Sequence, residues 1–133
     1  MEAIMVRVEA EVNLTEDEQK VEKAVTNVFD GLSIMINPSV NGDLLVGETK
    51  ERESLIKFRN LLRSDRIRDA ARRALFGGVR GTSIHFCLNK QVAFAGHVSF
   101  CEESAESPLG PLRVTIKCAD PRLLVDWLAE RSA

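Results

Sequence analysis

The sequence predicts an α+β domain in which helices pack on one face of a largely antiparallel sheet. Stretches that alternate between apolar and polar residues, typical of half-buried strands, are interspersed with stretches whose apolar residues recur at helical spacing. Hydrophobic residues make up 44% of the 133 residues, enough for one core in a chain of this length. Capping and turn residues separate the segments in the order β-α-β-β-α-α-β-β-β-α. We therefore expect residues 1–133 to form a single domain.

The chain begins with a predicted strand and helix. Residues 3–12 alternate, with valines and other apolar residues on one side and Met5 with three charged residues on the other. Thr15, with Glu18 three residues later, forms a capping-box pattern that predicts the start of a helix. This helix is expected to end near Phe29, where an Asp-Gly pair follows.

A hairpin and two helical segments are predicted next. Residues 32–36 and 44–47 are apolar strands that flank a segment rich in turn-forming residues. Thr49 and Ser64 are the expected caps of the two helices, and the glycine pair at residues 77–78 ends the second. The spacing leaves open whether the two helices form one kinked helix.

The last third of the chain predicts three strands and a helix. Residues 84–88 and 92–100 alternate and are expected to form a hairpin with a loop at residues 89–91. Residues 112–118 alternate in the same way and predict the last strand. Asp120 followed by a proline is typical of a helix start, with the aspartate as the cap.

Charge is distributed unevenly along the chain, although the net charge is only -2. Residues 1–48 carry ten acidic and three basic side chains, whereas residues 50–80 carry ten basic and four acidic ones. Eight of the ten basic residues are arginines, whose guanidinium forks bind phosphate at two points. A domain polarised in this way can attract a polyanion locally while it remains acidic overall.

The arginines of the two central helices are the candidate contacts to nucleic acid. Many of them are three or four residues apart, a spacing that places side chains on the same face of a helix. Arginines on opposite sides of Ser64 share a face only if the two helices are continuous. The predicted RNA-binding residues are Arg59, Arg63, Arg66, Arg68, Arg72 and Arg73, with Lys90, Arg113 and Lys117 as auxiliaries. The alternative is a solvated face on which Asp65 and Asp69 pair with arginines three residues ahead.

The outward face of the predicted sheet is small, polar and mildly basic. His85 and Cys87 share it with Arg113, Thr115 and Lys117 if the strand over residues 112–118 joins in the register that its apolar residues favour. This face is either an ordinary solvent face, a surface that approaches a phosphate backbone, or one that pairs with a second subunit. The aromatic residues Phe86, Phe94 and Phe100 are expected on the core face. We therefore expect no exposed platform for base stacking, which favours structured RNA over single strands.

The sequence offers no positive support for catalysis, a metal or a cofactor. The three cysteines lack C-x-x-C spacing, and His97 would lie at the far end of the predicted hairpin from Cys87. The connector after residues 77–78 lacks the Gly-Lys-Ser/Thr ending of a phosphate-binding loop. The number of cysteines is odd, so they cannot all pair within the chain, and free thiols are typical of the reducing cytoplasm. No apolar run is long enough to span a bilayer, and the acidic N-terminus is unlike a secretory signal. We therefore expect a cytoplasmic protein with no membrane contact.

Three motifs resemble an archaeal family of the uncharacterised-protein (UPF) type that is predicted to bind RNA. They are RIRDAAR at residues 66–72, FxLNKQxA at residues 86–93 and SPLGPL at residues 107–112. The resemblance extends over nearly the whole chain. It implies an α+β fold similar to the large-subunit ribosomal protein that binds 5S rRNA, and a relation to proposed exosome-associated RNA binders. It implies no catalytic residues.

These observations predict a cytoplasmic, non-enzymatic RNA-binding domain that contacts the phosphate backbone of structured RNA. The alternative is a protein-interaction or homodimerisation module that uses the open sheet face.

Overall fold

The computed structural model describes residues 3–40, 42–103 and 109–131, so the first two residues of the motif at 107–112 lie outside it. Within these ranges, seven strands form one sheet beside five α-helices and a short 3₁₀ helix. The strands are β1 (Ile4–Val12), β2 (Ser33–Asn37), β3 (Asp43–Thr49), β4 (Val79–Arg80), β5 (Ser83–Leu88), β6 (Phe100–Cys101) and β7 (Leu112–Cys118). The helices are α1 (Glu18–Val28), η1 (Arg52–Leu55), α2 (Ile56–Ser64), α3 (Arg68–Gly77), α4 (Lys90–Phe94) and α5 (Pro121–Leu128).

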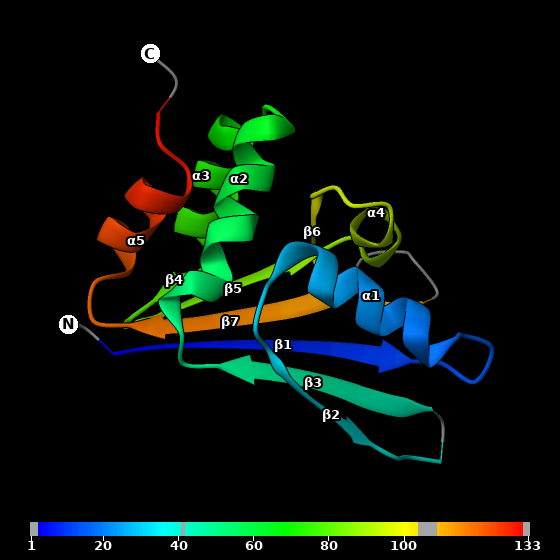
Figure 1. Ribbon diagram of the computed structural model, residues 1–133. Helices are drawn as coiled ribbons and strands as arrows, with labels where there is room; N and C mark the ends of the chain where they lie inside the picture. Colours follow the sequence, from blue (N-terminus) through cyan, green and yellow to red (C-terminus); the bar gives the residue numbers. More distant parts are fainter. Residues whose placement is uncertain (1–2, 41, 104–108, 132–133) are drawn as a thin grey trace.

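The predicted α+β class is confirmed. The strands follow the order β2-β3-β1-β7-β5-β4, β6 also pairs with β5, and every strand pair in the described residues is antiparallel. All the helices lie on one side of this sheet and leave its other face open (Figure 1). None of the helices described is long and apolar enough to cross a membrane.

The core lies between the sheet and the helices. Alternate residues of β1, such as Val6 and Val8, are fully buried in the same core as the apolar stripe of α1. Towards β5, the ring of Phe58 from α2 lies 5.1 Å from that of Phe29 and 5.6 Å from that of Phe86. Because these rings are inside, the helical layer is held to the sheet by packing, and the charged side chains of the helices remain outside.

The predicted strand over residues 92–100 is wrong. The side chain of Asn89 accepts a hydrogen bond from the amide of Val92 at 2.9 Å and caps α4, so the expected loop at residues 89–91 is a helix start instead. The chain turns back through Gly96, which has a φ of 88°, and only Phe100 and the residue after it pair with β5. As a result, Phe94 is 41% exposed rather than on the core face.

The two central helices are separate. Ser64 is the last residue of α2 rather than the cap of α3, and residues 65–67 connect the helices. Arg66 has a φ of 58°, the only positive φ at a non-glycine residue among the described ones, and this left-handed residue redirects the chain. Arg59 and Arg63 on α2 therefore do not share a helical face with Arg66.

Besides Ser64, the predicted caps are confirmed at one helix and wrong at two others. Asp120 accepts a hydrogen bond from the amide three residues ahead at 3.1 Å, and Pro121 occupies the first turn of α5, as predicted. At α1 the cap is Asp17 and not Thr15. Thr49 belongs to β3, and its hydroxyl accepts from the amide two residues ahead, before η1 begins.

Candidate nucleic-acid interface

Arg59 and Arg72 hold α5 against α2 and α3. The Arg59 side chain donates to the carbonyl of Trp127 at 2.8 Å and to the Glu130 carboxylate at 2.9 Å. Arg72 donates to the Asp126 carboxylate at 2.8 Å and to the carbonyl of Ala129, the C-cap residue of α5, at 3.0 Å. Their side chains are only 22% and 14% exposed, respectively. Two of the predicted RNA contacts are thus committed to packing between helices.

Arg63, Arg66 and Arg68 gather where α2 meets α3, and we call these three residues the arginine corner. Arg63 lies in the last turn of α2, Arg66 in the connection and Arg68 at the start of α3. Together with Asp69 they line a surface hollow of about 390 Å³. Within residues 3–40, 42–103 and 109–131, none of the three guanidinium groups forms an ion pair with a carboxylate.

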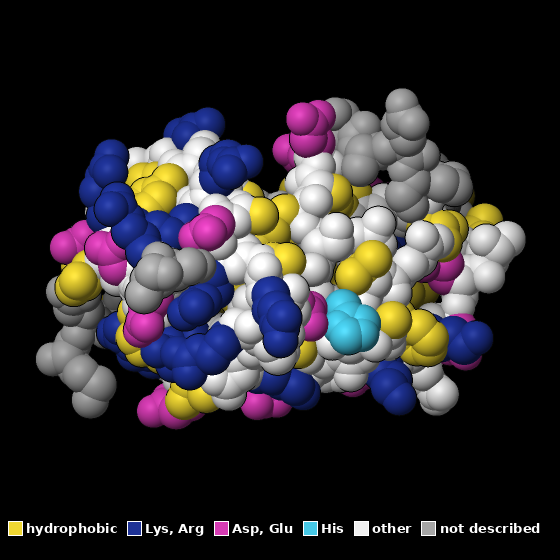
Figure 2. Space-filling view, turned by 90° about the horizontal axis from the view of Figure 1, so that it is seen from above, with side chains coloured by type: hydrophobic (Ala, Val, Ile, Leu, Met, Phe, Trp, Pro, Cys, Tyr) yellow, Lys and Arg dark blue, Asp and Glu magenta, His cyan; other side chains and the backbone are white. Residues whose placement is uncertain are grey.

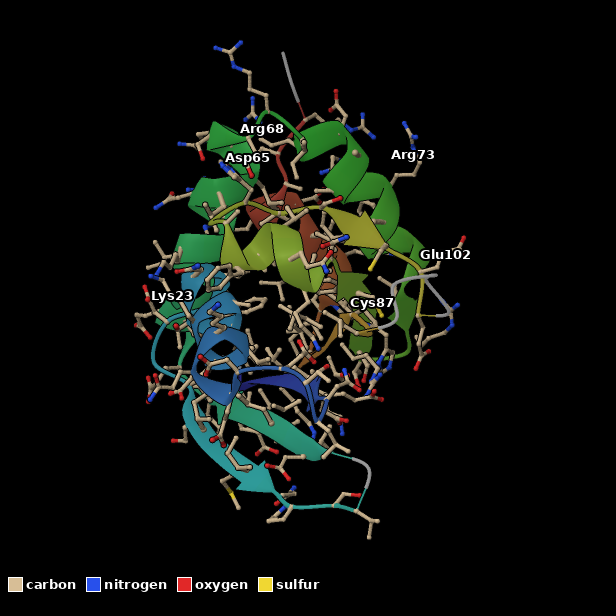
Figure 3. All side chains as sticks on the ribbon, turned by 90° about the vertical axis from the view of Figure 1, so that its right-hand side faces the viewer. Lys23, Asp65, Arg68, Arg73, Cys87 and Glu102 are labelled. Atoms are coloured by element: carbon tan, nitrogen blue, oxygen red, sulfur yellow. The ribbon has the colours of Figure 1, made fainter. Side chains whose placement is uncertain are left out.

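Asp65 does not neutralise the arginine corner, although its spacing from Arg68 allows a pair. Its carboxylate accepts from the amide of Val98 at 3.0 Å and lies 3.0 Å from Nδ1 of His97. It therefore ties the connection between the helices to the segment after α4. Figure 3 places Asp65, Arg68 and Arg73 at the same end of the molecule.

The basic surface extends to residues that the sequence analysis missed. Arg122 lies over the ring of Phe76, with its guanidinium carbon 5.8 Å from the ring centroid, and Arg131 lines a hollow that also contains Arg72. Both belong to the C-terminal segment, and only the packing of α5 on α3 brings them beside the central arginines. In Figure 2, basic side chains crowd the half of the helical face formed by α2, α3 and α5, with carboxylates among them.

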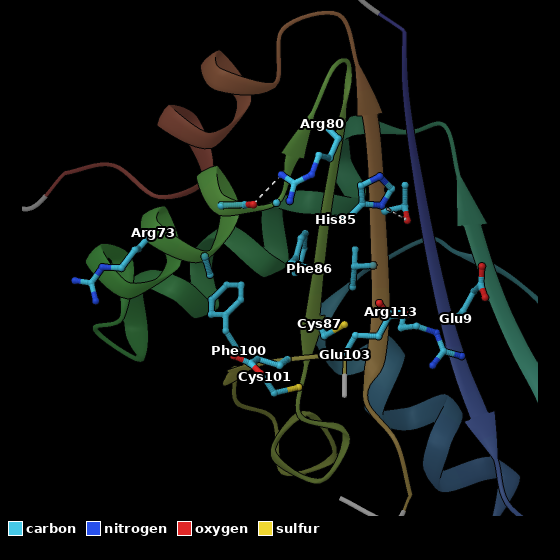
Figure 4. Close-up of a pocket in the computed structure, with 16 residues that line it drawn as sticks. Glu9, Arg73, Arg80, His85, Phe86, Cys87, Phe100, Cys101, Glu103 and Arg113 are labelled. Carbon is cyan, nitrogen blue, oxygen red and sulfur yellow. Dashed lines mark hydrogen bonds between the residues drawn. The ribbon is translucent and has the colours of Figure 1, made fainter. Parts of the chain in front are cut away.

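Arg73 does not line the hollow of the arginine corner, and in Figure 4 its guanidinium points away from β5. It borders a hollow of about 900 Å³ at the edge of the sheet (Figure 4). The charged and titratable side chains of this hollow are Glu9, Arg73, Arg80, His85, Cys87, Cys101, Glu102, Glu103 and Arg113. Because both signs of charge are present, the hollow as a whole is not a strongly basic site.

The three auxiliary residues are dispersed. Lys90 is 5% exposed and its ammonium lies inside the protein, so we leave it out of the candidate surface. Arg113 lies 3.5 Å from the carboxylate of Glu11. Lys117 is exposed on the open face of the sheet, away from the helical side that carries the arginine corner.

The predicted composition of the open sheet face is confirmed by the register. His85 opposes Thr115 and Cys87 opposes Arg113. Two cations on this face have carboxylate partners, however, because Arg7 pairs with Glu9 at 2.9 Å and also with Glu48, and Arg113 lies near Glu11. The hydrogen bond to Glu9 contributes most to raising the pKa of the Arg7 guanidinium. Carboxylates therefore interrupt the cations of this face, which does not form a continuous basic stripe.

Two thiols meet at the edge of the hollow, where Cys87 on β5 directly opposes Cys101 on β6. Burial raises the pKa of the Cys87 thiol to about 11, and the neighbouring Cys101 and Glu103 add to this effect against the opposing influence of Arg113. A thiol that remains protonated near neutral pH is a poor nucleophile.

In the folded protein, Cys87 is expected to react with iodoacetamide at about pH 8 roughly a hundredfold more slowly than in the unfolded chain, because the thiolate is the reacting species. Mass spectrometry of the peptide that contains Cys87 measures the rate, and the chain in guanidinium chloride serves as the control. The rate should keep rising until the pH reaches about 11. Equal rates in the folded and unfolded chains would contradict the burial of this thiol.

Several known proteins resemble this chain in sequence and in fold. A family model described as RNA binding matches residues 5–118. The UPF0201 protein of Sulfurisphaera tokodaii is 44% identical over 95% of this chain and 87% of its own length, and that of Sulfolobus acidocaldarius is 45% identical over the same shares. The crystal structure of the UPF0201 protein from Methanococcus jannaschii has a TM-score of 0.85 and 32% identity, covering 94% of this chain and 98% of that one. The names of these relatives denote no enzymatic activity.

Proposed function

The chain belongs to the UPF0201 family, whose matching family model is described as RNA binding, and from this premise we propose that it is a non-enzymatic protein that binds the phosphate backbone of structured RNA through the arginine corner. The observation that carries the proposal is that Arg63, Arg66 and Arg68 come together without a pairing carboxylate among the described residues. Such guanidinium groups are free to bind phosphate at two points each.

The scarcity of exposed aromatic rings among the described residues favours a duplex backbone over exposed bases. Phe94 is the one aromatic side chain among the exposed large hydrophobic residues of the described part, and it belongs to α4. Trp127 is covered by the guanidinium groups of Arg52 and Arg59, at 5.4 Å and 5.1 Å from its ring. Because sequence-specific binding of single strands relies on bases stacked on aromatic rings, the surface is better suited to the phosphates of an A-form helix.

Neighbouring cations extend this surface. Arg122 and Arg131 lie on the side of α3 that faces α5, and they add positive charge beyond the corner itself. Arg59 and Arg72 contribute indirectly, since they fix α5 in place. The likeness to the ribosomal protein that binds 5S rRNA stays a prediction from the motifs. On the open sheet face, carboxylates accompany Arg7 and Arg113, and we assign no RNA contact to this face.

A salt series tests the proposal. Fluorescence anisotropy with a labelled RNA duplex of about 16 base pairs should show binding at low salt. If three phosphates are neutralised, raising the salt from about 50 mM to about 200 mM should lower the affinity about 40-fold. The single strand of the same sequence is the control and should bind more weakly. Absence of binding at the lowest salt, or an affinity that does not change with salt, would rule out the proposal.

A further inference from the structure

Strand β2 forms an open edge of the sheet. It is at the end of the strand order and pairs only with β3 among the described residues, so the backbone groups on its other side point outward. No charged residue occurs between residues 32 and 40. An uncharged edge with unpaired backbone groups is a template for pairing with another strand.

The opposite edge of the sheet is protected. There, β4 and β6 are only two residues long, and β4 carries the charged side chain of Arg80, which donates to the carbonyls of Gly77 and Val79. Short strands and charged side chains are the usual means of preventing pairing at an edge. The contrast within one sheet indicates that the exposed edge of β2 is suited to a partner.

Both faces of β2 have apolar side chains. Met35 is 65% exposed on the open face of the sheet, beside Val46 of β3. On the helical face, Ile34 and Ile36 are half-buried at the rim of the core, where Ile36 opposes Leu45. A strand added to this edge would therefore cover apolar surface on both sides of the sheet.

We propose that β2 is a dimer interface, at which the β2 strand of a second copy of this chain pairs antiparallel around a two-fold axis at Met35. In this register Ile34 faces Ile36 of the second copy and Ser33 faces Asn37, so apolar residues meet apolar ones and polar residues meet polar ones. The strand has no charge that would be repelled by its own copy. The pairing forms roughly four to six backbone hydrogen bonds and joins the two sheets into one.

The interface and the arginine corner are separate. The strand order places β2 at the end of the sheet opposite to β4, whereas the arginine corner lies between α2 and α3 (Figure 1). Dimerisation through β2 therefore does not depend on RNA binding, and either can fail without the other. A variant of the arginine corner should remain dimeric.

Sedimentation equilibrium without RNA tests the dimer against the chain mass of 14.8 kDa. The wild-type protein should reach twice this mass as its concentration rises to about 1 mM. Met35→Lys and Met35→Glu should each be monomeric, because like charges would meet at the axis. An equimolar mixture of the two should recover the dimer. Leu123→Lys is the matched control, since this residue of α5 is 60% exposed, and it should dimerise like wild type.

Three outcomes would overturn the proposal. The first is a wild-type chain that stays monomeric, which would leave the edge to a strand of another protein. The second is a dimer that persists in both charged variants, and the third is a mixture of the two variants that does not recover the dimer. Circular dichroism with thermal melting shows whether each variant is folded, and Met35 is exposed enough that the monomer fold should be retained.

Discussion

Replacing Lys90 by alanine is expected to lower the free energy of unfolding by about 3–5 kcal/mol, because it removes one partner of a buried ion pair. The Lys90 ammonium donates to the carbonyls of Glu11 and Leu109, both at 2.6 Å, and to the carboxylate of Glu16 at 3.0 Å. Only 5% of the lysine side chain and 11% of the Glu16 side chain are exposed. Truncation would leave the carboxylate in the protein interior without its cation.

The protonation of Glu16 is consistent with this arrangement. Burial acts to raise the pKa of the Glu16 carboxyl, but hydrogen bonds from the backbone and side chain of Asn13 and from Lys90 together outweigh it and lower the pKa. The carboxylate therefore remains charged above its ordinary pKa of 4.5. At neutral pH the loss of Lys90 leaves a charge that Asn13 alone must stabilise.

Urea denaturation followed by circular dichroism measures this loss. Lys20→Ala is the matched control, since Lys20 is exposed on α1, and it should change the free energy of unfolding by less than about 0.5 kcal/mol. The double variant with Lys90→Met and Glu16→Gln should recover part of the stability, because it removes both buried charges. A cost for Lys90→Ala as small as that of the control would show that the ion pair is not buried in solution.

Lys90 also shows why part of the site could not be predicted. Its three acceptors come from β1, from the turn between β1 and α1, and from the segment before β7. No sequence spacing indicates that these segments meet. A lysine at a predicted turn is normally exposed, so the sequence favoured a surface role. The same holds for Arg59 and Arg72, whose partners belong to α5 and the two residues after it.

Local patterns predicted the fold where they were unambiguous. Strands β1, β5 and β7 alternate over six or more residues, and the Asp120–Pro121 pair determines the start of α5. The pattern misled over residues 92–100, where alternation coincides with a helix of only five residues that Asn89 caps. The break at Arg66 has no glycine or proline to indicate it, so the sequence alone does not decide whether the two helices are continuous.

Replacing Arg66 and Arg68 together by glutamate is expected to lower the affinity for duplex RNA by at least about a hundredfold, since two charge-assisted contacts of about 1.5 kcal/mol each are lost and repulsion is added. These two residues are better test positions than Arg72, whose contacts with Asp126 stabilise the packing of α5. Anisotropy with the duplex used for the salt series measures the change. Because two phosphate contacts are removed, the dependence of affinity on salt should also become weaker by about two units of slope.

Lys20→Glu with Lys23→Glu is the matched control, because it makes the same change in net charge on the exposed face of α1. If attraction between the whole protein and RNA were responsible, both double variants would weaken binding equally and the arginine corner would have no special role. If the corner is the contact surface, the control should retain most of its affinity and its salt dependence. The comparison therefore distinguishes a localised phosphate site from general electrostatic attraction, which matters for a chain whose net charge of -2 is itself unfavourable for RNA binding.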